Sequence, residues 1–192
     1  IILDAAQKEF AINGYSKASM NKIAKEAEFT KRTIYQYFEN KVDLYLTVAL
    51  RFYKSFLEHL EEIELDEKNN FENIKKLFFA FFNFFKENEN NFRIIYDIGK
   101  IRNETNNPKL DEYLKIDEII ASQLKVLIIE GQKDGSVNKD LNPKLITRSL
   151  MFLLISFFNQ LTITGKTYSK HIDEDSEKFT SYTLDLLSST LK

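Results

Sequence analysis

Residues 29–41, FTKRTIYQYFENK, decide how the rest of the chain is interpreted, because they predict a short helix with two different faces. Thr30 can cap this helix at its start, and Ile34 and Phe38 form an i, i+4 apolar pair that faces inward. The outer face then carries polar, basic and aromatic side chains, namely Lys31, Arg32, Thr33, Tyr35, Gln36 and Tyr37. Such a face suits a polyanion, and the alternative is that the two tyrosines merely pack against neighbouring helices.

The preceding residues predict a second short helix next to the first. Gly14 can end a helix over 1–13, and Ser19 can cap a helix whose apolar stripe is Met20, Ile23, Ala24 and Ala27. A turn at 27–29 leads from that helix to Thr30. Two short helices joined by a three-residue turn predict a helix-turn-helix, whose second helix can enter the major groove of DNA, where a glutamine can pair with adenine.

The remainder of the chain predicts longer helices. Asn40 can cap a helix that extends to about residue 63, with Asp43 at the capping-box position. After a break at 66–70, further helices are expected at 71–87, about 89–100, 109–133, 143–164 and 175–191. The two clearest connectors are 130–143 and 164–176. With only two Pro and five Gly in 192 residues, we expect an all-α fold of about nine helices.

Composition excludes several classes of function. The chain has no Cys and only two His, and it has no Gly-rich phosphate loop, so we expect no enzyme, no metal site and no cofactor. The longest apolar run, 150–158, is nine residues if Ser156 is not counted as a break, whereas a membrane span needs about 20. We therefore expect no transmembrane helix, no signal peptide and a cytoplasmic location. Residues 1–55 hold nine Lys and Arg against six Asp and Glu, whereas the remainder is acidic.

Residues 14–48, GYSKASMNKIAKEAEFTKRTIYQYFENKVDLYLTV, closely resemble the DNA-binding region of TetR-family transcriptional regulators. The resemblance implies a DNA-binding domain over 1–45 and a ligand-sensing, dimerising domain over 46–192. It also implies that Ser19, Tyr37 and Lys41 contact phosphates. The implied DNA-binding residues are Ser19, Thr30, Lys31, Arg32, Thr33, Tyr35, Gln36, Tyr37 and Lys41. Glu28 departs from the family, which usually has Gly in this turn, and it adds strain and a negative charge near DNA.

Residues 75–87, KKLFFAFFNFFKE, predict a helix that is apolar nearly all round and therefore buried on several sides. Its Phe side chains form either ordinary core or part of a ligand cavity. The resemblance implies such a cavity for a small, largely apolar or aromatic effector. The candidate ligand-binding residues are Tyr53, Phe82, Asn83, Tyr96, Tyr113 and Asn159.

The last two predicted helices have apolar faces that need partners, either within the chain or in a second copy. The resemblance favours a homodimer that binds a palindromic operator and is released by the effector. The candidate interface residues are Leu150, Leu154, Phe158, Phe179, Tyr182 and Leu186. Two alternatives remain, a DNA-binding structural or partner-binding factor without an inducer, and a membrane-surface protein that uses the Phe-rich helix.

Overall fold

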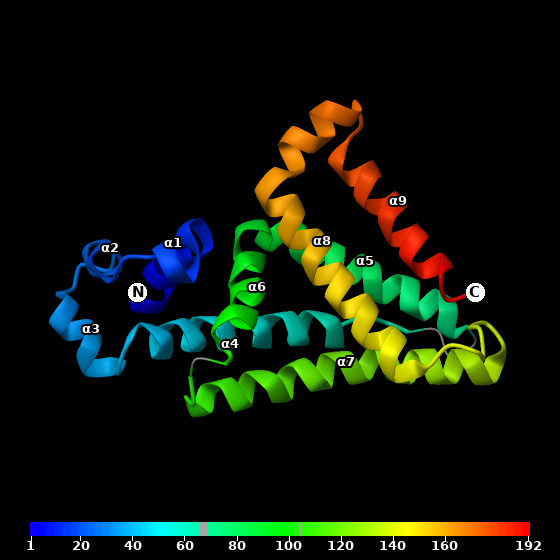
Figure 1. Cartoon of the computed structure of the whole chain (residues 1–192), viewed down its shortest axis with the longest axis horizontal. Helices are drawn as coiled ribbons and strands as arrows, with labels where there is room; N and C mark the ends of the chain where they lie inside the picture. The colour runs from blue at the N-terminus through cyan, green and yellow to red at the C-terminus, as the bar shows by residue number, and fades with distance from the viewer. Residues whose placement is uncertain (66–68, 104) are drawn as a thin grey trace. The chain divides into compact units, whose positions relative to one another are not determined.

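A computed structural model describes residues 1–65, 69–103 and 105–192. The described residues form helices and no strands, so the predicted all-α fold is confirmed (Figure 1). The α-helices are α1 (Ile2–Lys17), α2 (Met20–Glu26), α3 (Lys31–Tyr37), α4 (Lys41–Glu61), α5 (Asn70–Asn88), α6 (Phe92–Ile101), α7 (Pro108–Asp134), α8 (Pro143–Ile172) and α9 (Ser176–Ser189). They belong to two compact units, one of Ile1–Ser55 and Asn88–Ile116, the other of Phe56–Glu87 and Asp117–Lys192. The predicted domain boundary at residue 45 stays a prediction.

The first unit contains the predicted helix-turn-helix, and its caps are those expected from the sequence. The Ser19 hydroxyl accepts from the Lys22 N–H, and the Thr30 hydroxyl accepts from the Thr33 N–H at 3.1 Å. These bonds satisfy backbone donors that would otherwise have no partner at the helix starts. Ile34 is fully buried, so α3 packs on the unit through the side that carries this residue. The opposite side of α3 is available for other contacts.

Helix α6 lies beside α1 in the same unit and is tied to both α1 and α4 (Figure 1). The Arg93 guanidinium donates to the Ile12 carbonyl at 2.8 Å, and the Asp97 carboxylate accepts from the Tyr15 N–H at 3.0 Å. The buried Tyr45 hydroxyl of α4 donates to the Ile94 carbonyl at 2.6 Å. Helix α1, against which α2 packs, therefore rests on a segment that lies about 80 residues further along the chain.

The second unit is built around the Phe-rich α5. Phe56 packs edge-on against Phe81, and Phe85 stacks on Phe158 of α8 with ring centroids 4.8 Å apart. Helices α8 and α9 form an antiparallel hairpin (Figure 1). Ion pairs from Lys75 and Lys86 to α9 add links between α5 and α9. Most Phe side chains of α5 are thus core residues.

Three predicted boundaries differ from the structure. Helix α1 continues past Gly14 to Lys17 across a kink at that glycine, whose φ is 68°. Helix α8 ends at Ile172 rather than 164, because Gly165 is buried within the helix and the left-handed cap is Asp173, with φ 54°. A 3-10 turn at Glu89–Asn91 precedes α6. The predicted break at 66–70 lies partly outside the described residues.

Within the described chain, α8 is long and apolar enough, by length and composition, to cross a membrane. Its most apolar window has a mean hydropathy of 1.4, and 39% of that window is buried inside the protein. The sequence criterion of an unbroken apolar run did not detect this, because scattered polar residues interrupt the helix. A core helix passes the same test, so this property is weak evidence for a membrane span.

Candidate functional site

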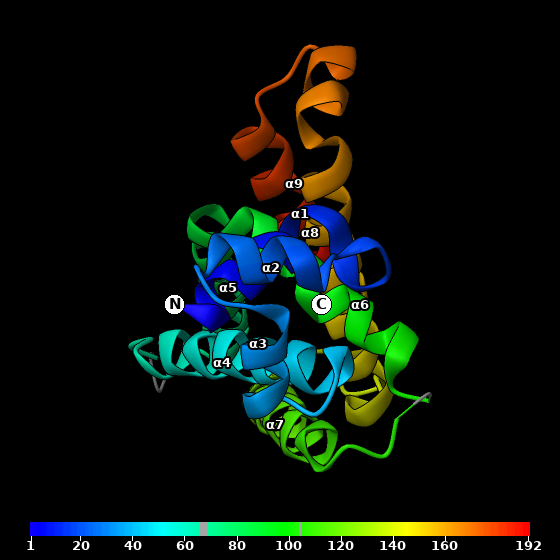
Figure 2. The same ribbon diagram turned by 90° about the vertical axis from the view of Figure 1, so that its left-hand side faces the viewer.

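Helix α3 lies between α2 and the start of α4 (Figure 2), and most of the predicted DNA-binding side chains on it are exposed. Lys31, Arg32 and Gln36 are exposed, and Tyr37 exposes 71% of its surface. Burial of so large an aromatic would be favourable, and nothing within the unit covers it. These residues therefore lie on one solvent-facing surface, which we call the α3 face.

Two hydroxyl groups at the start of α3 are already engaged within the chain. The Thr30 and Thr33 hydroxyls lie 2.8 Å apart, and Thr30 also caps the helix. The Lys31 ammonium lies 5.8 Å from the centroid of the Tyr35 ring, a cation–π distance that leaves its charge exposed. The structure thus divides the predicted set into threonines that build the helix start and cations and tyrosines that remain accessible.

Ser19 and Lys41 lie at the starts of α2 and α4, where backbone N–H groups favour an anion. The Lys41 ammonium lies 3.3 Å from the Ser16 carbonyl and 4.9 Å from the centroid of the Tyr15 ring. Burial lowers the pKa of Lys41, with partial compensation by the charge of Glu9. Lys41 therefore packs on the end of α1, a contact that the sequence did not indicate.

Glu28 occupies the turn between α2 and α3 with a φ of 60°. This is the left-handed region in which glycine is favoured, so the strain expected from the sequence is confirmed. The side chain is exposed and lines a shallow groove of about 560 Å³ together with Lys22 and Lys25. With three lysines and three glutamates in its lining, this groove is close to neutral.

Three of the predicted ligand-binding residues belong to the first unit. Tyr53 and Tyr113 are buried and stacked, with ring centroids 4.5 Å apart and an interplanar angle of 13°. Tyr96 is exposed on α6, where the Lys100 ammonium lies 4.8 Å from its ring centroid. Within this unit the structure therefore brings together two of the three, and their roles stay predictions.

The other three predicted ligand-binding residues belong to the second unit. Phe82 is buried and stacks on Phe158 with centroids 6.5 Å apart, whereas Asn83 is exposed. Asn159 exposes only 5% of its surface, and its side-chain oxygen has no hydrogen-bond partner among the residues that the structure describes. A buried polar atom without a partner is costly, and such atoms in native structures commonly serve a ligand or a water. Asn159 is the predicted residue with the clearest physical reason to meet a ligand.

The predicted interface residues divide between the core and the surface of the second unit, and their role in a dimer stays a prediction. Leu150, Leu154 and Phe158 are at most 1% exposed because they face the core of the second unit, and the half-buried Phe179 packs on Phe157. Tyr182 and Leu186 remain exposed, and the large apolar residues exposed on α8 are Leu145, Phe152, Leu153, Ile163 and Tyr168. The regular i, i+4 spacing of 150, 154 and 158 marks the core side of α8, and the other side carries less regular apolar residues.

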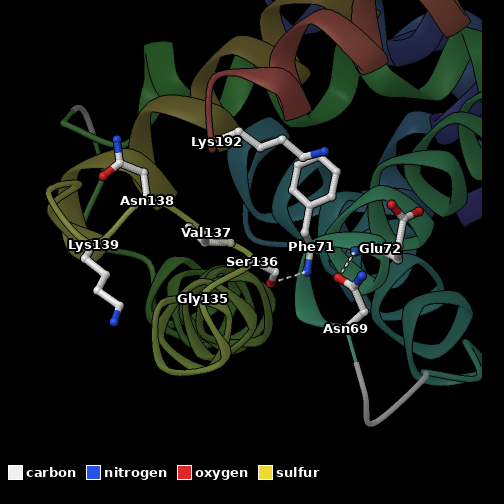
Figure 3. Close-up of a pocket in the computed structure, with 9 residues that line it drawn as sticks. All are labelled: Asn69, Phe71, Glu72, Gly135, Ser136, Val137, Asn138, Lys139 and Lys192. Carbon is white, nitrogen blue, oxygen red and sulfur yellow. Dashed lines mark hydrogen bonds between the residues drawn. The ribbon is translucent and has the colours of Figure 1, made fainter.

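A cleft of about 820 Å³ lies in the second unit where the start of α5 meets the connection between α7 and α8 (Figure 3). The Ser136 hydroxyl there accepts from the Phe71 N–H at 3.2 Å, and Lys192 lies over the Phe71 ring. None of the residues predicted from the sequence lines this cleft. Its lining is mainly backbone turns and helix caps, which carry no pattern that marks a ligand site.

The family described as bacterial regulatory proteins, tetR family, matches residues 2–48, which are the helices α1 to α3 and the start of α4. The fatty acid metabolism regulator protein of Bacillus subtilis is 29% identical over 154 residues, which cover 79% of this chain and 76% of that protein. Residues 2–48 therefore match the tetR family of bacterial regulatory proteins, and the chain as a whole is similar to a regulator of fatty acid metabolism.

Solved structures show the same fold over nearly the whole chain. FadR of Bacillus subtilis, in complex with stearoyl-CoA, has a TM-score of 0.72 at 24% identity and covers 100% of this chain and 98% of its own. The fatty acid degradation regulator FadR of Bacillus halodurans has a TM-score of 0.73 at 22% identity and covers 97% and 92%. At these identities the likeness is one of fold.

Proposed function

We propose that this protein is a cytoplasmic repressor that binds a palindromic operator as a homodimer and leaves it when a fatty acyl-CoA binds the second unit. The observation that carries the proposal is the α3 face, where cations, Gln36 and Tyr37 are exposed while Ile34 anchors the helix from within. Arg and Lys neutralise phosphates or bond guanine, and a glutamine pairs with adenine.

The effector class is supported by two observations of different kinds. A fatty acid metabolism regulator is among the relatives, and a FadR of the same fold was solved with stearoyl-CoA. In this chain, the second unit has a Phe-rich interior, and within the described part of the chain the Asn159 oxygen has no hydrogen-bond partner. An apolar site with one polar group suits an acyl chain that carries a thioester. These observations favour an inducible regulator over a partner-binding factor.

Dimer formation is supported by the exposed apolar side chains of α8 and α9. Phe152 exposes 73% of its surface and Tyr182 exposes 71%, and both belong to the second unit. Covering such a surface in a second copy is favourable and creates a two-fold axis. Two copies of α3 related by this axis could read half-sites one helical turn of DNA, about 34 Å, or a multiple apart.

The first test is selection of duplexes from a random DNA pool. We expect an enriched palindrome that binds an even number of chains, with Gln36→Ala changing the preferred base at one position of each half-site. Selection without enrichment at low salt would contradict DNA recognition through the α3 face. Enrichment of the same sequence by the Gln36→Ala variant, at lower affinity, would exclude Gln36 as a base reader.

The second test titrates the complex with the enriched duplex. We expect stearoyl-CoA to release the protein from DNA, with coenzyme A and stearate each much weaker, because each supplies only part of the ligand. Fluorescence anisotropy of the labelled duplex measures release. If no acyl-CoA of any chain length changes the anisotropy, while binding of the duplex is intact, the effector class is wrong and the partner-binding alternative gains support.

A further inference from the structure

Asp43 lies in the first turn of α4, close in sequence to the end of α3, and is 6% exposed. Its Oδ2 accepts from the Glu39 N–H at 3.2 Å, and its own N–H donates to the Asn40 side-chain oxygen at 2.9 Å. These bonds fix the turn of residues 38–40 that ends α3 and begins α4. The conformation of residues 38–40 sets the orientation of α3 relative to α4.

The other oxygen of the same carboxylate is held by the start of α7. Asp43 Oδ1 accepts from the Lys109 ammonium at 2.5 Å and from the Asn107 side-chain amide at 3.1 Å. Asn107 is itself fixed, because its side-chain oxygen caps α7 by accepting from the Lys109 N–H at 2.9 Å. A rigid helix start, 64 to 66 residues away in sequence, therefore holds the turn after α3.

Lys109 also approaches the last residue of the recognition segment. Its ammonium lies 5.8 Å from the centroid of the Phe38 ring, and Phe38 is the cap that ends α3. Burial alone would raise the pKa of Asp43, but the hydrogen bonds from Lys109, Asn107 and the Glu39 N–H outweigh it and hold that pKa below its ordinary value. The carboxylate is thus charged at neutral pH and needs its cation.

Removing Lys109 would leave a buried negative charge with amide donors alone. Such a charge is strongly unfavourable unless it is paired or hydrated. The turn at 38–40 could relieve it by opening to water, which would release the end of α3. The predicted effect is a change in the orientation of α3 and involves no lost contact with DNA.

We propose that Lys109 is a positioning residue for DNA binding, which acts through Asp43 to fix the turn at 38–40 and thereby the orientation of α3. The inference rests on DNA binding through the α3 face. It assigns a role in operator affinity to the start of α7, outside the family-matched residues 2–48.

The test compares Lys109→Met with the wild type on the duplex enriched by the wild type, over a range of salt concentrations. We expect about tenfold weaker binding with an unchanged dependence of log K on log salt, because no phosphate contact is removed. Lys115→Met is the matched control, since Lys115 is an exposed lysine on the same helix, and it should bind as the wild type does. A slope reduced by about one in Lys109→Met would make Lys109 a phosphate contact and overturn the proposal.

A double-mutant cycle tests whether the pair acts as one unit. Asp43→Asn together with Lys109→Met should bind no more weakly than either single variant, since the unpaired charge is gone. Additive losses would contradict the pairing. If Lys109→Met does not fold, Lys109→Arg and Lys109→Gln take its place, with binding within twofold of wild type expected for Arg and intermediate binding for Gln. Equal binding by these two variants would overturn the role of the charge.

A readout without DNA separates this inference from the proposed function. In Lys109→Met, amide hydrogen exchange at Glu39 should be faster than in the wild type, because its acceptor carboxylate moves with the turn. Unchanged exchange at Glu39 would overturn the inference even if the protein binds DNA. A wild type that enriches no duplex would contradict the proposed function. The exchange rate at Glu39 would still test whether Lys109 fixes the turn at 38–40.

Discussion

Glu28 is the residue whose backbone most clearly conflicts with its side chain, since its φ of 60° lies in the region that favours glycine. We expect Glu28→Gly to raise the free energy of unfolding by about 0.5–1 kcal/mol through relief of strain. We also expect tighter DNA binding at low salt, because a negative charge is removed beside the α3 face. Urea unfolding and anisotropy measure the two effects.

Asp173→Gly is the matched control for Glu28→Gly. Asp173 has a φ of 54° at the end of α8 and belongs to the second unit. The substitution should relieve similar strain and leave DNA affinity unchanged. Both substitutions relieve strain and remove one carboxylate, so equal gains in DNA affinity would show that the position of Glu28 beside the α3 face does not matter.

Asn159 is the residue at which stability and function are expected to oppose each other. Its buried oxygen has no hydrogen-bond partner in residues 1–65, 69–103 and 105–192, so Asn159→Leu should raise the free energy of unfolding by about 1–2 kcal/mol. The same change should weaken binding of stearoyl-CoA, because the polar group that meets the ligand is lost. Thermal unfolding and calorimetric titration measure both. Asn83→Leu, at an exposed position of α5, should change stability by less than about 0.5 kcal/mol.

At the scale of elements, the contact between α1 and α6 depends on Gly14. Its φ of 68° and ψ of 169° are nearly restricted to glycine, and an added Cβ would lie 2.7 Å from Asp97 Oδ2. Gly14→Ala should therefore lower the free energy of unfolding by at least about 1–3 kcal/mol. Gly99→Ala, on α6 with open space around its Cβ, should stabilise by about 0.5–1 kcal/mol. Similar urea midpoints for the two variants would contradict the close contact.

The helices themselves were largely predictable from local chemistry. Ser19, Thr30 and Asn40 cap the helices that the sequence assigned to them, because a cap depends on residues only two or three positions apart. The end of α8 was not predicted, since Gly165 and the polar residues after it indicate a connector when neighbouring helices are unknown. The bond between Asp43 and Lys109 joins residues 66 positions apart and has no local pattern.

In the candidate site, too, the features that depend on local sequence were predictable and those that depend on tertiary packing were not. The exposed α3 face follows from the burial of Ile34 and the short helix that surrounds it. The distinction between the core and outer sides of α8 could not be read from apolar spacing, because both sides carry large apolar residues. Tertiary packing, here against α5, decides which side is covered.

At the scale of the whole molecule, dimerisation should control operator affinity. Phe152→Glu places a charge on the exposed apolar side of α8 and should weaken the dimer by about a hundredfold. Operator binding should then require a higher protein concentration, because two copies of α3 must act together. Sedimentation velocity and anisotropy measure the two effects. Val126→Glu, at an exposed apolar position of α7, should leave both unchanged, and a monomeric Val126→Glu would place the interface elsewhere.

The unit that contains α3 is discontinuous in sequence, since it combines Ile1–Ser55 with Asn88–Ile116. A hybrid regulator made by grafting residues 1–48 onto a relative would carry α1 to α3. It would lack Arg93, Asp97 and Lys109, which bond to α1 and to the start of α4. The recipient's own segment would then face a foreign α1 and a foreign Asp43. Transfer of sequence specificity without loss of stability therefore requires an exchange of both pieces, so that the graft includes 88–116.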